Sequence, residues 1–458
     1  MLQLVYTTMF LMLVIPDAYI YFVYVRKWTG DWKWRLLSFL PSLLLVIYFI
    51  VVLANDDMRA SHQPMVCMFA TIFYLITIPK TVFAIFDSIG FTTKCLMRRS
   101  EAKVAQAVKQ EDGKDEEPDT EIPAWSEKTH RYIRLFAMAL AICSIYIVIY
   151  GYIWGRSNFK VNQHTVEFKN LPPEFDGYRI LHFSDLHLGT FDDGHRDYVT
   201  TIANLINSQK CDLVLFTGDI VNYESGELLG YKEVLSSIKA PDGVYSVLGN
   251  HDYEMYFKFP EDKSKYNEYE VNHYLYLDEK ERDADVEVIK SKQKEYGWNL
   301  LLNQNSIIRR GNDSIAIIGT ENHGKSDRFP RRADLPKATK GLYNIMKDSI
   351  DTDGINKDSE SMLPSHTFSI LLTHDPTYWR MAVLSRTNID LTLAGHTHAG
   401  QFKIFGWSPV SFNYDEWSGF YDQGEQILNV NDGLGENIFP FRFGAWPEID
   451  VITLKRGE

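Results

Sequence analysis

Acidic, amide and histidine side chains follow several apolar runs in the second half of this chain, and these runs are typical of buried β-strands. The side chains stand in the short stretches SDLH, TGD, GNHD, LTHD and GHTH. In a strand, side chains at positions i and i+2 project to the same side, so D-x-H and H-x-H can each direct two ligands at one point. Carboxylate, amide and imidazole donors together suit divalent transition metals such as Mn, Fe and Zn.

These candidate ligands offer more donors than one ion can use. They are Asp185, His187, Asp219, Asn250, His374, His396 and His398. A pair of ions that share one carboxylate accounts for this number of donors. None of the four cysteines stands in a CxxC pair, so we expect neither a thiolate metal site nor a disulfide framework. The sequence therefore predicts a centre for two divalent ions, whose identity stays open among Mn, Fe and Zn.

The elements that position these ligands alternate along the chain from about residue 165. Short β-rich runs and helical stretches follow one another, which is typical of a layered α/β fold. In open α/β sheets, ligand sites lie at the carboxyl ends of the strands, where these motifs stand. Residues 253–300 interrupt the rhythm with many charged residues and little apolar periodicity. We interpret them as an insertion or a cap near the site, outside the central sheet.

The motifs also carry a family resemblance. The order D-x-H, G-D, G-N-H-D, H and G-H-x-H, each after a strand, resembles the calcineurin-like metallophosphoesterase superfamily over roughly residues 165–458. The tail that begins GHTHAGQF and ends WPEIDVITL resembles the membrane-anchored or exported bacterial branch of that superfamily. The resemblance implies a metallophosphoesterase domain with α/β/β/α layers, which we assign to residues 155–458.

The resemblance also implies a role for each candidate residue. One ion is held by Asp185, His187 and His398 and the other by Asn250, His374 and His396, while Asp219 bridges the two. Two ions about 3.5–4 Å apart can acidify a bridging water, and the resulting hydroxide attacks phosphorus in line. His251 then stabilises the developing charge or protonates the leaving oxygen. Asp252 orients an imidazole or an amide.

One stretch departs from the family pattern. Many members read G-D-x-x-D-R, whereas this chain reads GDIVNY, with Asn222 in place of the Asp that often supports the catalytic His. We therefore expect His251 to lack that partner. The phosphate-binding Arg of the pattern is also missing. Arg442 in PFRFGAW is a candidate for that task, with a surface or structural arginine as the alternative. His182 in ILHFSD alternates with core positions, so we expect a hydrogen-bonded core histidine.

The N-terminal third reads as a membrane domain. Four apolar runs, about residues 2–25, 36–54, 64–86 and 133–154, are long enough to span a bilayer, which takes roughly 20 residues. We predict four transmembrane helices within residues 1–154 and a polar cytoplasmic loop over 87–132. Lys and Arg concentrate in the first and third connecting loops. The positive-inside rule therefore places the C-terminal domain on the extracytoplasmic side of the cell membrane.

Two charged residues fall inside the predicted spans. Asp17 and Lys80 each follow a proline, and they stand at corresponding depths of spans that run in the same direction. Because a charge in hydrocarbon costs at least a few kcal/mol, we hypothesise that the two side chains pair between helices. The alternative is that both reach toward the membrane interface separately.

These observations favour a membrane-anchored, metal-dependent phosphoric ester hydrolase. The net charge of −13 argues against a nucleic-acid partner held through its phosphates. A tether confines the enzyme to the bilayer, which favours a lipid-linked phosphoester or pyrophosphate, with monoester, diester and pyrophosphate all open. The alternative is a receptor or scaffold whose phosphoesterase domain only binds. Such a domain is expected to have lost a ligand, and every candidate ligand is present.

Overall fold

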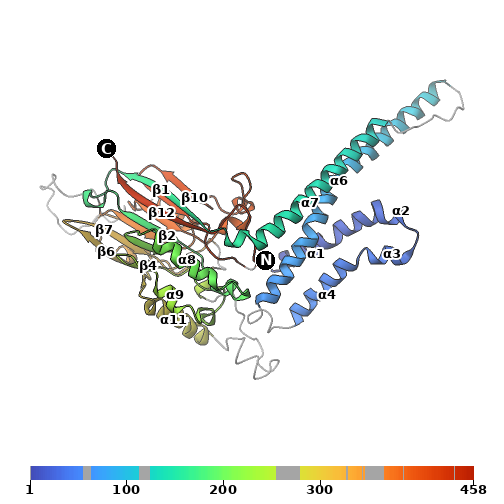
Figure 1. Ribbon diagram of the computed structural model, residues 1–458. Coiled ribbons are helices and arrows are strands. Elements are labelled where there is room, and N and C mark those ends of the chain that lie inside the picture. Colours follow the sequence, from blue (N-terminus) through green and yellow to red (C-terminus); the bar gives the residue numbers. More distant parts are fainter. Residues whose placement is uncertain are drawn as a thin grey trace. The chain divides into compact units, whose positions relative to one another are not determined.

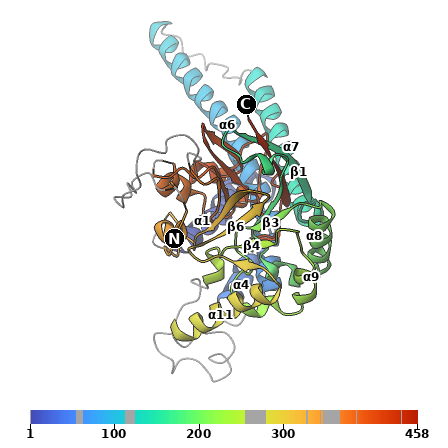
Figure 2. The ribbon, with the colours of Figure 1, turned by 90° about the vertical axis from the view of Figure 1, so that its left-hand side faces the viewer.

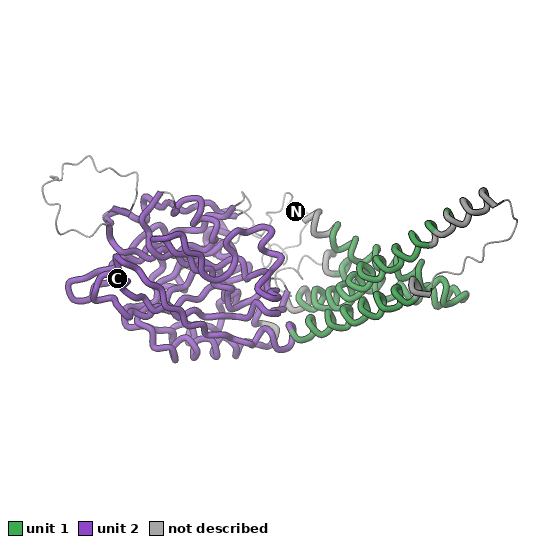
Figure 3. Tube along the Cα trace, turned by 90° about the horizontal axis from the view of Figure 1, so that it is seen from above, with its two compact units in different colours: residues 1–55, 67–150 green, residues 56–66, 151–458 purple. Residues whose placement is uncertain are grey.

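The structure, a computed structural model, describes residues 2–54, 63–112, 124–253, 279–325, 329–342, 344–345, 366–384, 386–437 and 439–457. The chain divides into two compact units (Figure 3). The first comprises Met1–Asn55 and Cys67–Tyr150, and the second comprises Asp56–Val66 and Gly151–Glu458. The apolar helices fall mainly in the first unit and all the strands fall in the second.

The first unit is helical throughout the part that is described. Its elements are α1 (Leu2–Ile20), the π-helix η1 (Tyr21–Val25), α2 (Arg26–Trp28), α3 (Trp32–Leu37), α4 (Leu40–Ala54), α6 (Gln63–Asp112) and α7 (Ala124–Ile153). Three helical stretches are long and apolar enough to cross a membrane: Thr7–Trp28, Cys67–Met97 and Lys128–Ile153. A shorter apolar stretch lies at Leu40–Val51. The predicted spans therefore correspond to three long apolar helices and a shorter one.

Two predicted boundaries in this region are wrong. The second span was predicted to start at Leu36, but the helix is interrupted there. The short helix α3 ends at Leu37, and the apolar helix α4 begins only at Leu40. Pro41 explains the break, since proline is tolerated in the first turn of a helix but not in its interior. The predicted loop 87–132 is largely helical, because α6 continues to Asp112 and α7 begins at Ala124. The extension is rich in Ala, Lys, Glu and Gln, which favour helix even where the sequence is polar.

Buried polar contacts join the membrane helices. The ammonium of Lys80 lies 2.6 Å from Asp17 Oδ1 and 2.7 Å from Ser42 Oγ, so the predicted pair is confirmed and links α1, α4 and α6. The buried carboxylate of Asp87 accepts hydrogen bonds from the hydroxyls of Tyr19 and Tyr24. Paired polar groups of this kind hold helices together where the hydrophobic effect between them is absent.

The second unit contains two six-stranded mixed sheets (Figures 1 and 2). The first sheet has the order β1 (Lys160–Phe168), β12 (Glu448–Arg456), β2 (Arg179–Phe183), β3 (Leu213–Phe216), β4 (Val244–Ser246) and β5 (Asn299–Leu300). The second has the order β10 (Gly419–Gln423), β11 (Gln426–Val430), β9 (Leu391–Ala394), β8 (Ser369–Leu372), β7 (Asp313–Gly319) and β6 (Gln304–Arg310). Strands β2 to β5 run parallel, as do β7, β8, β9 and β11.

Helices and short turns connect the strands of this unit. The α-helices are α8 (Asp197–Ser208), α9 (Lys232–Ser236), α11 (Glu279–Glu295) and α12 (Leu335–Ala338), and η8 (Trp379–Val383) is a π-helix. The short 3₁₀ turns are η2 (Gly155–Ser157), η3 (Pro173–Phe175), η4 (Leu188–Asp193), η5 (Ser225–Leu228), η6 (His251–Tyr253), η9 (His398–Gln401) and η10 (Pro409–Phe412).

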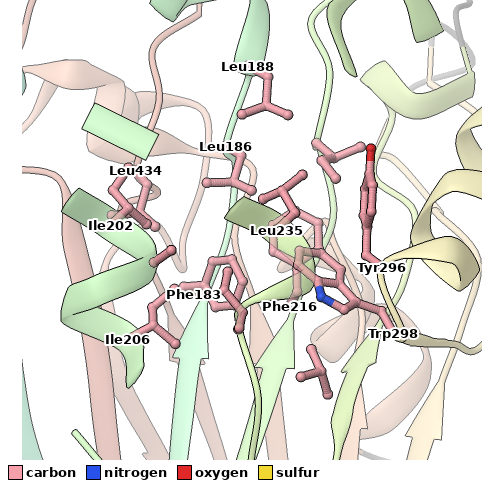
Figure 4. Close-up of a cluster of buried hydrophobic side chains, with 14 of the residues drawn as sticks. Phe183, Leu186, Leu188, Ile202, Ile206, Phe216, Leu235, Tyr296, Trp298 and Leu434 are labelled. Carbon is pink, nitrogen blue, oxygen red and sulfur yellow. The ribbon is translucent and has the colours of Figure 1, made fainter. Parts of the chain in front are cut away.

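Three apolar layers hold the domain together. Phe183 and Phe216, on one face of the first sheet, pack with Ile202 and Ile206 of α8 (Figure 4). The opposite face of that sheet packs on the second sheet, and Leu215 and Ile370 belong to the shared cluster. A third cluster covers the far face of the second sheet with α12 and η8. The predicted α/β/β/α layering is therefore confirmed.

Part of the predicted insertion belongs to the central fold. Within residues 253–300, α11 buries Val286 and Ile289 in the core cluster beside the first sheet, and β5 pairs with β4. The sequence did not indicate this helix, because most of its residues are charged and the single face that it buries needs few apolar residues. Residues 254–278 lie outside the described residues.

Candidate metal centre

The candidate ligands stand immediately after five parallel strands of the two sheets. Asp185 and His187 follow β2, Asp219 follows β3, Asn250 follows β4, His374 follows β8, and His396 and His398 follow β9. Because both sheets present these carboxyl ends at one edge, residues from distant parts of the chain meet there. All of these residues are buried except His396, which is half-buried. The side chain of His396 is 9% exposed.

The backbone is unusual at most of these positions. Five candidate ligands adopt left-handed backbone conformations: Asp185 (φ 54), His187 (φ 43), Asp219 (φ 59), His396 (φ 75) and His398 (φ 50). Residues other than glycine seldom adopt positive φ, and each instance costs of order 1–3 kcal/mol when the surroundings enforce it. Such strain concentrates at functional sites, where the fold aims a side chain in one direction at the expense of local stability.

The first group of ligands is Asp185, His187 and His398. His187 Nε2 lies 3.1 Å from His398 Nε2, and Asp185 Oδ1 lies 3.4 Å from His398 Nε2 and 3.8 Å from His187 Nε2. These three atoms can hold one ion, since ligands about 2.0–2.2 Å from a metal lie about this far from one another.

The second group is Asp219, His374 and His396, and a third group of His187, Asp219 and His251 connects it to the first. His374 Nε2 lies 3.0 Å from Asp219 Oδ2 and 3.2 Å from His396 Nδ1. The same Asp219 oxygen lies 3.7 Å from His187 Nε2. One carboxylate oxygen thus stands between an imidazole of each group. Asn250 follows β4 and is buried beside Gly249, whose Cα faces Asp219.

Glycines let the ligand loops approach one another closely. A Cβ on Gly249 would stand 2.1 Å from Asp219 Oδ1, and one on Gly395 would stand 2.2 Å from Asp185 Oδ2. The DGLGEN segment after β11 packs on the first ligand loop, because a Cβ on Gly435 would stand 2.0 Å from the carbonyl oxygen of Leu186. These glycines permit close approach of backbone to backbone.

Several ligand imidazoles are oriented by hydrogen bonds to the ring nitrogen that faces away from the other candidate ligands. His374 Nδ1 donates to the carbonyl oxygen of Thr217 at 2.8 Å, which directs Nε2 at Asp219. His396 Nε2 lies 2.9 Å from the hydroxyl of Tyr414. Partners of this kind fix the tautomer and the plane of a metal-binding ring. The sequence did not single out Tyr414, because it lies in an irregular segment with no motif.

Arg442 does not face the site, so its prediction as a phosphate clamp is wrong. The guanidinium is fully buried and donates to the carbonyl oxygens of Asp432, Gly435 and Ala445. It also lies 3.1 Å from His398 Nδ1. A side chain occupied in this way has no free donor fork for a phosphate. Its contacts support the alternative of a structural arginine that also orients a ligand.

His251 has a partner that the sequence did not reveal. Its Nδ1 lies 2.6 Å from the backbone carbonyl oxygen of Asn222, which can only accept, so the proton resides on Nδ1. The amide of Asn437 lies 3.2 Å from Nε2. His251 thus has no aspartate at this nitrogen, and the main chain of Asn222 takes the place of the expected partner. Asn437 was overlooked, although its place after the end of β11 was a usable signal.

Asp252 supports the loop that carries Asp219. Its carboxylate accepts backbone N–H bonds from Asp219, Ile220 and Gly249, each at 2.8–2.9 Å. Its partners are therefore main-chain groups rather than an imidazole or a side-chain amide. His182 is buried and bonds to Asn429 and Thr217, which confirms the prediction of a core histidine.

The close packing of acids and imidazoles shifts their pKa values. Burial lowers the pKa of His374, but the carboxylates of Asp219 and Asp185 outweigh it and raise this pKa to about 10. Burial alone would raise the pKa of Asp185, but the neighbouring imidazoles of His398 and His187 hold it well below its usual range. Burial lowers the pKa of His251 to about 4, so the ring is neutral at pH 7. The carboxylates of the centre are therefore ionised, as metal ligands must be.

The donor set fits a pair of divalent ions. Buried carboxylate oxygens and imidazole nitrogens converge in two groups, which a third group containing His187 and Asp219 connects. The free cysteines lie elsewhere along the chain. Facing ring nitrogens 3.1–3.2 Å apart repeat in both groups, an arrangement that a shared cation between them satisfies. The clusters are therefore consistent with a dinuclear metal site.

Comparison with known families agrees with this geometry. A family profile described as "Calcineurin-like phosphoesterase" matches residues 178–400. A second, described as "Probable Calcineurin-like phosphoesterase, transmembrane domain", matches residues 3–156. The chain thus belongs to the calcineurin-like metallophosphoesterases, as a multi-pass membrane protein with an N-terminal transmembrane domain.

Several curated proteins are similar to this chain. An uncharacterized metallophosphoesterase of Bacillus subtilis, YkuE, is 29% identical over 65% of this chain and 85% of its own length. A "Transmembrane protein with metallophosphoesterase domain" of Danio rerio is 27% identical over 70% of this chain, but the match spans only 63% of the fish protein. An uncharacterized metallophosphoesterase of Campylobacter jejuni is 26% identical over 72% of each chain.

Proposed function

We propose that this protein hydrolyses a phosphoester or pyrophosphate bond with the help of two divalent cations drawn from Mn, Fe and Zn. The observation that carries the proposal is the position of Asp219 Oδ2, 3.7 Å from His187 Nε2 and 3.0 Å from His374 Nε2. A carboxylate oxygen between two ligand groups suits a bridging role, and bridged metal pairs recur in enzymes that hydrolyse phosphoesters.

In this proposal the ligands divide as follows. Asp185, His187 and His398 would hold one ion, Asn250, His374 and His396 would hold the other, and Asp219 would serve both. The ions, when bound, supply an acidified water as nucleophile and neutralise charge on the phosphate oxygens. The chain orients two of these ligands through the carbonyl of Thr217, which holds His374, and the guanidinium of Arg442, which lies against His398.

His251 manages a proton, and Asp252 supports the loop of the bridging ligand. Because Nδ1 of His251 is held by the carbonyl of Asn222, Nε2 is the nitrogen that takes up a second proton, and the resulting imidazolium would return this proton to the leaving oxygen or stabilise its charge. His251 also donates its backbone N–H to Asp219 Oδ1 at 2.8 Å, which ties the proton donor to the bridging ligand. Asp252 acts through this loop as a positioning residue.

The membrane domain favours a substrate at the bilayer. A catalytic domain that is permanently tethered meets lipid-linked phosphoesters at high local concentration, so a lipid-linked monoester, diester or pyrophosphate is the substrate class we favour. The lysines and arginines of the connecting loops favour the extracytoplasmic side for the catalytic domain.

The test uses the full chain, purified in detergent and supplied with Mn²⁺. We expect the protein to hydrolyse p-nitrophenyl phosphate or bis-p-nitrophenyl phosphate and to contain about two metal ions per chain by elemental analysis. Asp219→Ala should lose both the hydrolysis and the bound metal. Asp422→Ala is the matched control, because Asp422 is exposed near the end of β10, where it accepts only from the backbone N–H of Gly424 among the contacts described. A receptor or scaffold would show no metal-dependent hydrolysis with either ester, and that result would overturn the proposal.

A further inference from the structure

An aromatic hairpin protrudes beside the metal centre. Ile404 and Trp407 exchange both backbone hydrogen bonds, at 2.9 and 3.0 Å, around the two-residue turn Phe405–Gly406. Phe405 at the tip is 102% exposed, Trp407 is 44% exposed, and Phe412 shortly after the hairpin is 81% exposed. We call residues 404–412 the aromatic hairpin segment. Large side chains of this kind on one exposed loop mark a binding surface.

The tip residue is unfavourable in two respects. Phe405 has φ 49 and Gly406 has φ 78, a pair of left-handed residues that normally selects Asn-Gly, Asp-Gly or Gly-Gly. A phenylalanine there has a strained backbone and also leaves its whole ring in water. Neither feature helps the domain to fold, so the ring is explained by something that it contacts outside the domain.

The hairpin is tied to the end of a membrane helix. The candidate span Lys128–Ile153 ends within the second unit, whose larger segment begins at Gly151. The carbonyl oxygen of Gly151 accepts from Arg442 N at 3.2 Å, and Gly155 packs so closely that a Cβ there would stand 1.8 Å from the Arg442 oxygen. The neighbouring Phe443 accepts from Lys403 N at 2.8 Å, at the base of the hairpin.

Exposed apolar side chains gather at these two places. Among the described residues from Gly151 onwards, most of the large exposed ones belong either to the end of α7 or to the aromatic hairpin segment. They are Tyr152, Ile153 and Trp154 in the first group and Phe405, Trp407 and Phe412 in the second, and only Leu229, Val288 and Met381 lie elsewhere. Tyr and Trp, which combine an apolar ring with a polar group, concentrate where a membrane helix meets water.

The segment is also attached to the ligand loop. Ser408 Oγ donates to the carbonyl oxygen of Ala399, next to His398, and the hydroxyl of Tyr414 lies 2.9 Å from His396 Nε2. Whatever the hairpin touches is therefore held close to two candidate metal ligands.

We propose that the aromatic hairpin segment inserts into the interfacial region of the bilayer that holds the protein's own helices. The occupant is lipid because the span Lys128–Ile153 ends on the same framework, and because the exposed side chains at both places are mostly aromatic. This docking would hold the loop that carries His396 and His398 near the lipid headgroups. The inference concerns a membrane contact and stands whether or not the centre is catalytic.

The experiment measures the depth of single labels on the full chain in phosphatidylcholine–phosphatidylglycerol vesicles. Phe405→Cys and Phe412→Cys, each in a background with Ala at the four native cysteines, carry an NBD fluorophore. Lipids with a spin label at the headgroup or high on the acyl chain serve as quenchers. Glu425→Cys is the matched control, because it is an exposed hairpin position at the amino end of β11, opposite to the ligand loops.

We expect both hairpin labels to shift to the blue and to be quenched at least about threefold more strongly than the Glu425 label. Equal quenching at all positions would overturn the proposal, and so would labels at 405 and 412 that stay in water or become protected only when protein concentration rises. That last result would indicate a second copy of the chain as the occupant. Either labelled position suffices, so a failure of one variant to fold leaves the other as the test.

Discussion

The backbone carbonyl oxygen of Asn222 lies 2.6 Å from Nδ1 of His251 and fixes the proton on that nitrogen. The side chain of Asn222 takes no part in this contact, so the main chain performs the task for which many members of the superfamily use an aspartate. The same turn follows the bridging candidate Asp219. The orientation of His251 is therefore coupled to the loop that holds the metals.

This relationship predicts different outcomes at the two residues. His251→Ala should lower kcat by about 10²- to 10⁴-fold, the usual contribution of a proton donor, while metal content stays unchanged. Asn222→Ala should leave kcat within about threefold, because the carbonyl remains. Steady-state kinetics with an aryl phosphoester, alongside elemental analysis, measure both effects. If Asn222→Ala were as damaging as His251→Ala, the side chain would be needed after all.

Gly249 should be intolerant of even one methyl group. A Cβ there stands 2.1 Å from Asp219 Oδ1 and 2.7 Å from the Asp219 nitrogen, so Gly249→Ala must displace the bridging carboxylate. We expect metal affinity to fall at least about 10-fold, as when the supports of a metal ligand are removed. Metal titration followed by calorimetry measures the change.

Gly226→Ala provides the matched control for this substitution. A Cβ at Gly226 meets only Glu224, at an ordinary distance of 3.6 Å. It should bind metal as the wild type does. Equal affinity in the two alanine variants would show that the Asp219 loop adapts and that its close packing has no role.

Arg442 should matter for stability rather than for substrate binding. Arg442→Met leaves the carbonyl oxygens of Asp432 and Ala445 without their donor in a buried place. The loss of a fully buried, hydrogen-bonded charge costs about 3–5 kcal/mol. Thermal unfolding in detergent should show a clear drop, whereas Arg456→Met, at an exposed position of β12, should be nearly neutral. A raised KM with unchanged stability would instead restore the phosphate-clamp interpretation.

Glu227 should make the metal-free protein less stable as pH rises. Burial raises the pKa of Glu227 from 4.5 to about 7, although the backbone N–H groups of Asn222 and Tyr223 offset part of the effect. Because the folded-state pKa is the higher one, its stabilising contribution is complete below about pH 4.5 and is lost as pH rises through about 7. The difference across that window is on the order of 3 kcal/mol.

The measurement compares unfolding of the wild type and Glu227→Gln at pH 5 and pH 8 in the presence of a chelator. The wild type should lose stability between the two values relative to the variant, because a glutamine does not titrate. Parallel pH profiles for the two proteins would contradict the assignment of this titration to Glu227.

The Asp17–Lys80 pair should show rescue by exchange. Asp17→Lys places two like charges in apolar surroundings, at a cost of at least a few kcal/mol, and should reduce the yield of folded protein in detergent. The double variant Asp17→Lys, Lys80→Asp restores opposite charges and should recover much of the yield. Size-exclusion chromatography of the solubilised protein measures it. Equal losses in the single and double variants would mean that the contact contributes nothing to folding.

The sequence by itself determined which residues form the candidate metal centre and which region crosses the membrane. Both signals are local: a ligand such as Asp185 or His374 stands one or two residues after a buried strand, and an apolar run of sufficient length spans a bilayer wherever it occurs. The charged pair inside the spans was also readable, because a lone charge in hydrocarbon is costly enough to demand a partner.

Only the tertiary structure decided the contacts between segments that are distant in the chain. The support of His251 by a main-chain carbonyl has no sequence signature, since every residue offers one. The burial of Arg442 behind His398 and the membership of β5 in the central sheet depend on which loops meet. The exposure of Phe405 likewise appears only once its neighbours are placed, because an apolar side chain in a sequence is expected in a core until the fold leaves it outside.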